Sequence, residues 1–164
     1  MGQKNKFLLI SLLIVLFLIG CNSNDRNTDV DVFQYKGSYV GDNSAVINSV
    51  IQLQGAEHFK GLELKTTDEP YGITVNYDWS ESELDDKETA IHNASYLFTL
   101  IQNVDWIHFD FEMVEEVYEY KMTRENLQEW YGIEFSEIDN EVKLRNVIQE
   151  SLKDEKMINQ LSNL

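Results

Sequence analysis

The residues best suited to metal or acid–base chemistry lie at alternate positions of one short segment. His108 is followed by Asp110 and Glu112, and alternate residues of a β-strand point to the same face. Imidazole and carboxylate groups together can bind a divalent metal ion. However, one extended strand spaces such residues almost ~7 Å apart, and the solvated face of an acidic protein has the same pattern. We therefore predict no metal site and no cofactor.

Other motifs that carry chemistry are missing from the sequence or lack the required spacing. His92 is followed four residues later by Tyr96, so a helical His-x-x-x-His zinc pair is absent. The acidic run 81–86 has neither the alternating Asp nor the Gly of a calcium-binding EF-hand loop. Nucleophile, phosphate-loop and dinucleotide fingerprints do not occur either. We predict that the protein is not an enzyme; a carboxylate-based hydrolase of the cell envelope stays open as the alternative.

Aromatic side chains form a second group of candidates, because they can line a groove for a peptide or a glycan. They are Trp79, Trp106, Tyr118, Tyr120, Trp130 and Tyr131. Most aromatic residues in a domain of this size belong to the core. Trp106 differs, since strand alternation places it with His108 and Asp110 rather than on the apolar face.

The first twenty residues have the anatomy of an export signal. Lys4 and Lys6 precede an uncharged apolar run, which ends at Leu18-Ile19-Gly20-Cys21. This ending resembles the bacterial lipobox, in which the Cys is lipidated and becomes the mature N-terminus. A transmembrane helix is one other interpretation, but the run is shorter than the ~20 residues that a spanning helix needs. An uncleaved or Ala-cleaved signal is another, but no Ala-x-Ala site precedes Asn22.

The lipobox resemblance implies a lipid anchor on Cys21 and a location on the outer face of the cell membrane. We assign residues 1–20 to the signal peptide, 21–32 to a flexible tether and 33–164 to a single domain. Cys21 is the one cysteine of the chain, so the exported domain has no thiol for a disulfide or a catalytic nucleophile. Two acyl chains hold a protein stably at a membrane, whereas one holds it only marginally.

The charge of the chain excludes one class of partner. The sequence has 13 basic and 29 acidic side chains, a net charge of −16. Because Lys4 and Lys6 belong to the signal, the remainder has 11 basic and 29 acidic groups, or −18. Nucleic-acid binding requires Lys and Arg to neutralise phosphates, so we predict no nucleic-acid partner. A solvated acidic surface and a cationic partner both remain compatible with this charge.

Hydrophobic periodicity predicts two units of similar design. Asp42, Asn43 and Ser44 are N-cap candidates for a helix that ends at Gly55. Alternating residues from Leu62 to Lys65 and from Tyr71 to Tyr77 then predict a hairpin, with turn residues from Thr67 to Pro70.

The second unit repeats this order. Ser80 and Glu83 predict a capping box for a helix that buries Ala90, Ala94, Leu97, Phe98 and Ile101. A second hairpin follows over residues 107–113 and 117–122. A helical tail, 123–164, comprises a short helix between Thr123 and Gly132 and a last helix from about Ser136. The predicted fold class is α+β: two helix-plus-hairpin units form an antiparallel sheet that helices cover, with a helical C-terminal tail.

Two motifs connect the chain with a known family. They are the run from Tyr35 to Val46, which contains Tyr-Val-Gly-Asp-Asn-Ser, and the run from Glu69 to Tyr77. Both resemble the domain of unknown function 4825, found in small lipoproteins of Bacillus-like bacteria and on the outside of membrane metallopeptidases of the antibiotic-sensor type. The resemblance covers about residues 33–122. It implies an extracellular setting and a sensing or accessory role, with no established activity to transfer.

Together these features predict a lipid-anchored extracytoplasmic lipoprotein that acts as a non-catalytic binding or sensing module. Its partner would be the membrane, through Cys21, and a membrane or envelope protein. A structural or immunity-type lipoprotein is a further alternative. The candidate contact residues are Asp42, Asn43, Ser44, Tyr71, Trp106 and His108. The first three are included because a helix N-terminus offers free N–H groups to an anion or a partner carbonyl.

Overall fold

The computed structural model describes residues 31–153. The predicted signal peptide, Cys21, nearly all of the tether and the last eleven residues lie outside this range. No helix within residues 31–153 combines the length and the apolar character that crossing a membrane requires.

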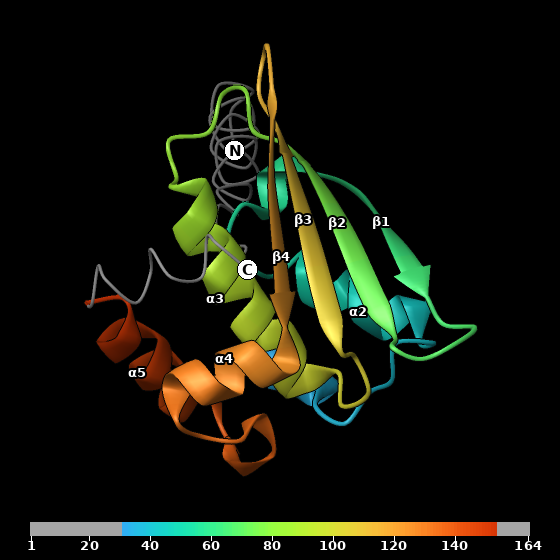
Figure 1. Cartoon of the computed structure of the whole chain (residues 1–164), viewed down its shortest axis with the longest axis vertical. Helices are drawn as coiled ribbons and strands as arrows, with labels where there is room; N and C mark the ends of the chain where they lie inside the picture. Colours follow the sequence, from blue (N-terminus) through green and yellow to red (C-terminus); the bar gives the residue numbers. More distant parts are fainter. Residues whose placement is uncertain (1–30, 154–164) are drawn as a thin grey trace, which may run out of the picture. The chain divides into compact units, whose positions relative to one another are not determined.

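The described elements follow the predicted order of helix, hairpin, helix, hairpin and two helices (Figure 1). The strands are β1 (Phe59–Lys65), β2 (Gly72–Asp78), β3 (Trp106–Glu112) and β4 (Val117–Thr123). The α-helices are α2 (Asn43–Val50), α3 (Asp86–Leu100), α4 (Arg124–Tyr131) and α5 (Glu141–Ser151). Three 3-10 helices are η1 (Val32–Tyr35), η2 (Ala56–His58) and η3 (Phe135–Glu137). The predicted α+β fold with a helical C-terminal part is confirmed.

The four strands form one sheet in the order β1-β2-β3-β4. Both predicted hairpins are antiparallel, but β2 and β3 pair in parallel. The sheet is therefore mixed, and the prediction of a wholly antiparallel sheet is wrong. The cause is α3, which carries the chain from the end of β2 back to the end where β2 began, so that β3 starts beside Gly72 and runs the same way.

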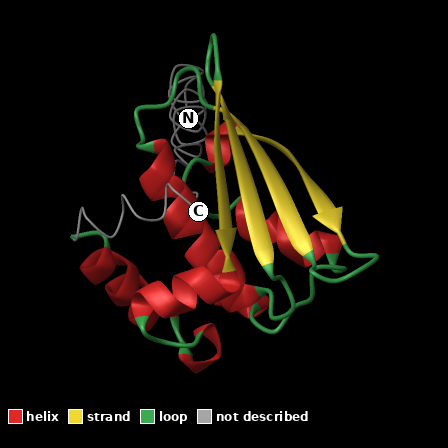
Figure 2. Ribbon diagram, viewed as in Figure 1, coloured by secondary structure: helices red, strands yellow, loops and turns green. Residues whose placement is uncertain are grey.

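One face of the sheet forms the core together with α2 and α3 (Figure 2). Its central strands contribute alternate residues, all fully buried: Ile73, Val75, Tyr77, Ile107, Phe109 and Phe111. The aromatic members contact each other directly, with Tyr77 and Phe111 ring centroids 5.2 Å apart and nearly parallel. Trp79 joins them edge-on, 4.7 Å from Phe111. Trp79 is thus a core residue.

Both N-terminal helices differ from prediction at one end. α2 ends at Val50 rather than near Gly55, because Leu53 turns into the core and Gly55 adopts a left-handed backbone with φ 72°. The capping box predicted at Ser80 and Glu83 is wrong, since α3 begins at Asp86. Its N-cap is Asp85, whose side chain accepts a hydrogen bond from Glu88 N at 2.8 Å.

The segment between β2 and α3 is bonded to the side chain of Trp79. The Trp79 indole donates a hydrogen bond to the Leu84 carbonyl, 3.2 Å away. This contact ties the loop to a buried side chain, so residues 80–84 form a turn and the helix starts after it. The acidic residues around Asp86 still lie at the helix start, where the helix dipole favours negative charge.

The C-terminal helices contribute to the same core as α3. α4 has the predicted Thr123 N-cap and the predicted end at Gly132, which is left-handed with φ 64°. The last helix, predicted from about Ser136, begins only at Glu141 after η3, with Asn140 as its N-cap. Phe135, Leu144 and Ile148 are buried in the common core.

Arg124 joins this C-terminal part to the end of α3. Its guanidinium donates hydrogen bonds to three backbone carbonyls, those of Phe98, Ile101 and Val104, at 2.7, 2.7 and 2.9 Å. The last carbonyls of a helix have no partner within the helix. Arg124 therefore satisfies groups that burial would otherwise leave unpaired, and it brings α4 against α3.

Candidate functional site

The second face of the sheet, which we call the open face, is covered by no element among residues 31–153. Strand alternation places mainly charged and polar residues on it, and they are half-buried or exposed except for the buried Gly72. Across the sheet they align in rows: Gly72, Trp106 and Thr123; Thr74, His108 and Lys121; Asn76, Asp110 and Glu119; Asp78, Glu112 and Val117. β1 adds Glu63 beside Thr74 and Gly61 beside Asn76.

Trp106 lies flat at one end of the open face, above Gly72. A Cβ atom built on Gly72 would be 2.0 Å from Cε2 of the indole, so a side chain at this position would displace the ring. The indole N–H donates to the Pro70 carbonyl at 3.2 Å. The Lys121 ammonium is 5.4 Å from the ring centroid, within range of a cation–π interaction. Trp106 is thus held in place on a surface without joining the core.

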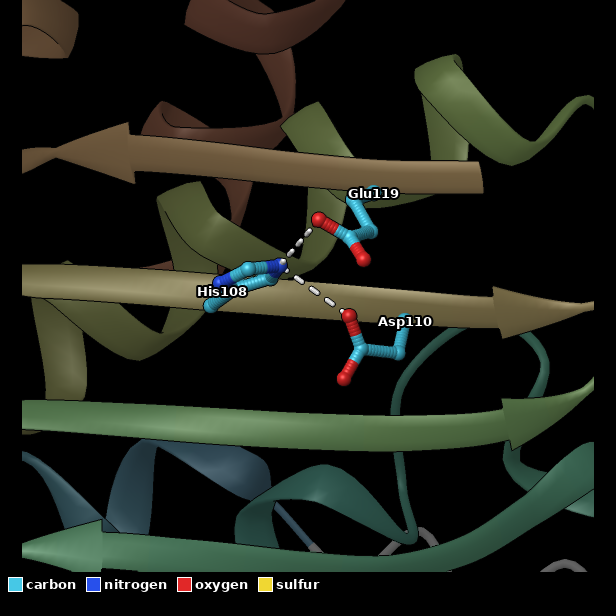
Figure 3. Close-up of side chains that lie close together, drawn as sticks. All are labelled: His108, Asp110 and Glu119. Atoms are coloured by element: carbon cyan, nitrogen blue, oxygen red, sulfur yellow. Dashed lines mark ion pairs between the residues drawn. The ribbon is translucent and has the colours of Figure 1, made fainter. Parts of the chain in front are cut away.

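His108, Asp110 and Glu119 converge in the middle of the open face (Figure 3). His108 Nε2 is 3.0 Å from Asp110 Oδ1 and 3.8 Å from Glu119 Oε2. The side chains of His108 and Asp110 are 28% and 25% exposed, against 66% for Glu119. One potential ligand atom from each residue lies within 4.8 Å of the other two, a spacing compatible with a single metal ion.

Two other acidic residues of this face, Glu112 and Asp78, have local partners. Lys60, in an irregular part of β1, forms an ion pair with Glu112 across the sheet. The hydrogen bond from Lys60 to Glu112 raises the pKa of the lysine. Hydrogen bonds from the Ser80 hydroxyl and amide lower the pKa of the Asp78 carboxyl. Glu112, predicted to accompany His108 and Asp110, is therefore committed to another partner.

The six residues predicted from the sequence as contacts divide into two groups. Trp106 and His108 lie on the open face. Asp42 is the N-cap of α2 and accepts a hydrogen bond from Ala45 N at 3.1 Å. Asn43 and Ser44 are the exposed first residues of that helix, which belongs to the core side of the sheet.

Tyr71 belongs with the core side as well. Its side chain packs against the core, while its amide donates to Asp105 Oδ2 at 2.6 Å. Its carbonyl accepts from the amides of Asp105 and Trp106. Tyr71 thus fixes the start of β3 and with it the position of Trp106. The structure brings together two of the six predicted residues and gives Asp42 and Tyr71 positioning contacts.

Glu119 is the site residue that the sequence reasoning missed. It comes from β4 and stands directly opposite Asp110. The signal was present, because the turn at residues 114–116 fixes the register of the hairpin. Counting back from that turn pairs residue 112 with 117 and residue 110 with 119. Considering one strand alone led to Glu112 instead.

A carboxylate-based hydrolase would need two acidic side chains facing each other across a cleft, with one shielded from water. Asp110 and Glu119 do face each other, but they stand on an open sheet face and Glu119 is 66% exposed. A cleft lies next to Trp106, between the sheet end and α4, and is lined by Asp105, Lys121, Arg124 and Glu125 among others. Asp110 and Glu119 do not line this cleft.

Comparison with known proteins identifies the domain. No curated protein and no solved structure matches the chain. Residues 32–123 match the family model described as Domain of unknown function (DUF4825). The match runs from η1 to the end of β4, so it includes both hairpins, α3 and the whole open face. Because it covers more than half of the 164 residues, the chain belongs to the DUF4825 family.

Proposed function

We propose that this protein is a lipid-anchored, extracytoplasmic binding module of the cell envelope, which engages a membrane or envelope protein through its open face. The observation that carries the proposal is that aromatic and charged side chains lie on the uncovered face of the sheet. On a surface that no described element covers stand an indole held by a hydrogen bond and an imidazole beside two carboxylates. Exposed aromatic and charged groups that a rigid scaffold positions are typical of binding surfaces.

The anchor part of the proposal is supported by the sequence preceding the domain. The lipobox-like run ends at Cys21, and the described domain begins about ten residues later. A lipid on Cys21 would confine the domain to the membrane surface, where binding to another membrane protein becomes easier because the effective concentration is high. The strongly acidic domain would be repelled by anionic lipid, so its face would stay available to a protein.

The structure also helps to choose between two predicted contact regions. The helix start at Asp42 uses its side chain to cap α2. By contrast, the open face presents Trp106 with a cation over its ring and His108 beside two carboxylates. The open face is therefore the better supported contact surface, and we propose it rather than the helix-start loops.

Site-directed photo-cross-linking on living cells tests this function. A photoreactive amino acid replaces Glu63, which is exposed on the open face of β1 beside Thr74. The control replaces Val142 on α5, which is 65% exposed and belongs to the C-terminal helices. We expect a discrete adduct of one envelope protein from position 63 and none from 142. Equal labelling at both positions, or no adduct from 63 under several stress conditions, would contradict the proposal.

The anchor is tested separately by Cys21→Ser. We expect radiolabelled palmitate to be lost from the protein and the domain to appear in the medium or as an uncleaved precursor. Unchanged palmitate incorporation would show that the lipobox interpretation is wrong, because the chain has no second cysteine to acylate.

A further inference from the structure

The open face contains a cluster that its own protein groups do not neutralise. We propose that His108, Asp110 and Glu119 form a binding site for one divalent cation of the zinc class, with an outward coordination position left for water or for a ligand from a partner. This departs from the sequence-based prediction of no metal site. The reason is Glu119, which the fold brings from a second strand to the place that Glu112 was predicted to fill.

The distances suit a single small cation. Ligands at ~2.1 Å from a tetrahedral zinc ion lie ~3.4 Å from one another. The His108 Nε2 to Asp110 Oδ1 distance is 3.0 Å, and the Nε2 to Glu119 Oε2 distance is 3.8 Å, so the two values bracket the ideal. All three ligand atoms lie within 4.8 Å of one another. Glu119 has the most exposed side chain of the three, at 66%, so it has the most room to adjust its distance to the other two ligands.

The strand pairing places two carboxylates next to each other, and a cation between them would relieve their repulsion. Asp110 and Glu119 are direct cross-strand neighbours, and like charges in directly opposite positions destabilise a sheet. Two lysines on the same face are engaged elsewhere, since Lys60 pairs with Glu112 and Lys121 lies over Trp106. The third, Lys65, stands in another row of the sheet, beside Gly72. Within residues 31–153, the ion pairs of Asp110 and Glu119 run to His108 alone.

The imidazole nitrogen provides a second, independent observation. His108 Nε2 is shielded from solvent, yet it makes no hydrogen bond of acceptable geometry within the described part of the chain. The Asp110 oxygen is close enough, at 3.0 Å, but lies off the direction in which an N–H would donate. A shielded nitrogen without a hydrogen bond is costly. A metal ion placed between the nitrogen and the two carboxylates would use its lone pair directly.

The ligand set indicates the class of metal. Imidazole suits zinc and its neighbours, whereas calcium prefers six to eight oxygen ligands and magnesium an octahedral oxygen shell. Three protein ligands with a fourth position open is the arrangement of zinc sites that exchange a water or an external ligand. The net charge of −16 favours the approach of any cation. A metal here would give the open face a point of attachment for a histidine or carboxylate of a partner.

The competing explanation is that a protonated His108 serves as the counter-cation for both carboxylates. Metal and proton compete for the same nitrogen, and they predict different results. If a proton alone is involved, added zinc changes nothing. If the site binds metal, zinc displaces the proton, and removal of either carboxylate weakens its binding.

Isothermal titration calorimetry with zinc chloride tests the site on tag-free protein comprising residues 22–164. This stretch retains every described element of the domain, from η1 to α5. The variants are His108→Ala, Asp110→Asn and Glu119→Gln. The matched control is Glu112→Gln, an acidic residue of the same strand and face that pairs with Lys60 instead. Circular dichroism checks that each variant is folded.

We expect one zinc ion per chain, and a loss of affinity of more than about tenfold in each of the three variants, since removal of even an outer partner of a metal ligand costs 10–100-fold. The control should bind zinc as the unaltered chain does. Absence of zinc binding at millimolar concentration, or equal affinity in all variants, would overturn the proposal. Zinc binding by the purified chain requires neither a lipid nor a partner protein, so this result and that of the cross-linking experiment are independent.

Discussion

The two faces of the sheet are built from the same four strands but differ in how their side chains interact. On the core face, Tyr77 and Phe111 stack at 5.2 Å and both are fully buried. On the open face, Asp110 stands opposite Glu119 with a shielded imidazole nitrogen beside them. The first arrangement stabilises the fold, whereas the second costs stability. The difference indicates where function should be sought: among side chains whose positions do not serve packing or hydrogen bonding within the fold.

The largest effect on stability should come from the core face. We predict that Phe111→Ala lowers the free energy of unfolding by about 3–5 kcal/mol, because the ring contacts Tyr77, Trp79 and Tyr120 and its removal leaves a cavity. Urea denaturation followed by circular dichroism measures this loss. A change in the free energy of unfolding below about 1 kcal/mol would mean that the core face does not stabilise the fold more than the open face does.

The link between α3 and the C-terminal helices is the next test of the core side. We predict that Arg124→Met lowers the free energy of unfolding by about 2–3 kcal/mol, because three carbonyls lose a charged donor. Arg124→Lys should recover little of it, since an ammonium group cannot donate along the same three directions. Equal stability of the Lys variant and the unaltered protein in urea denaturation would show that the guanidinium geometry is unimportant.

Titration of a buried phenol gives a pH test of the same contrast. Burial raises the pKa of Tyr77, while its hydrogen bond with Asn93 acts in the opposite direction. Since the unfolded phenol ionises near pH ~10, the contribution of Tyr77 is complete below that pH and is lost as the pH rises, by up to about 1.4 kcal/mol per pH unit.

We therefore expect Tyr77→Phe to show a weaker loss of stability between about pH 10 and 11 than the unaltered protein, measured by urea denaturation at each pH. Burial also raises the pKa of Tyr131, so part of the loss remains. Tyr39→Phe is the control, because Tyr39 is 57% exposed. If Tyr39→Phe flattens the pH dependence as much as Tyr77→Phe, burial is not its cause.

The smallest effect should come from the open face and should have the opposite sign. In metal-free buffer, Glu119→Gln relieves the repulsion from Asp110, so we predict a gain in stability of a few tenths of a kcal/mol. Urea denaturation in the presence of a chelator measures it. A loss of 1 kcal/mol or more would show that Glu119 stabilises the fold, and would remove the argument that it is kept for binding.

Sequence periodicity predicted most of the fold because the strands alternate cleanly. Ile107, Phe109 and Phe111 alternate with His108 and Asp110, and this assigned both faces of β3 correctly. Periodicity does not determine how two hairpins join, so the parallel β2–β3 pair was missed. It also cannot show that Trp79 would take residues 80–84 into a turn and delay α3 to Asp86.

The candidate site was only half predictable for a related reason. His108 and Asp110 are two residues apart, so one strand sufficed to place them together. Glu119 lies nine residues beyond Asp110, and the pair forms only through the register of the hairpin. Likewise, nothing local to Trp106 indicates that Gly72, on another strand, provides the space for its ring. The site is assembled by pairing between strands, and the pattern of residues within one strand does not reveal that pairing.

The most direct test of the central claim is a two-dimensional amide NMR spectrum of residues 22–164 recorded during a zinc titration. The claim is that the open face, rather than the acidic surface in general, is where the protein binds. We predict that shift changes concentrate at His108, Asp110 and Glu119 and on neighbouring residues of β3 and β4. The acidic start of α3, from Asp85 to Glu88, serves as an internal comparison. Shift changes concentrated there, or spread evenly over acidic residues, would contradict the account.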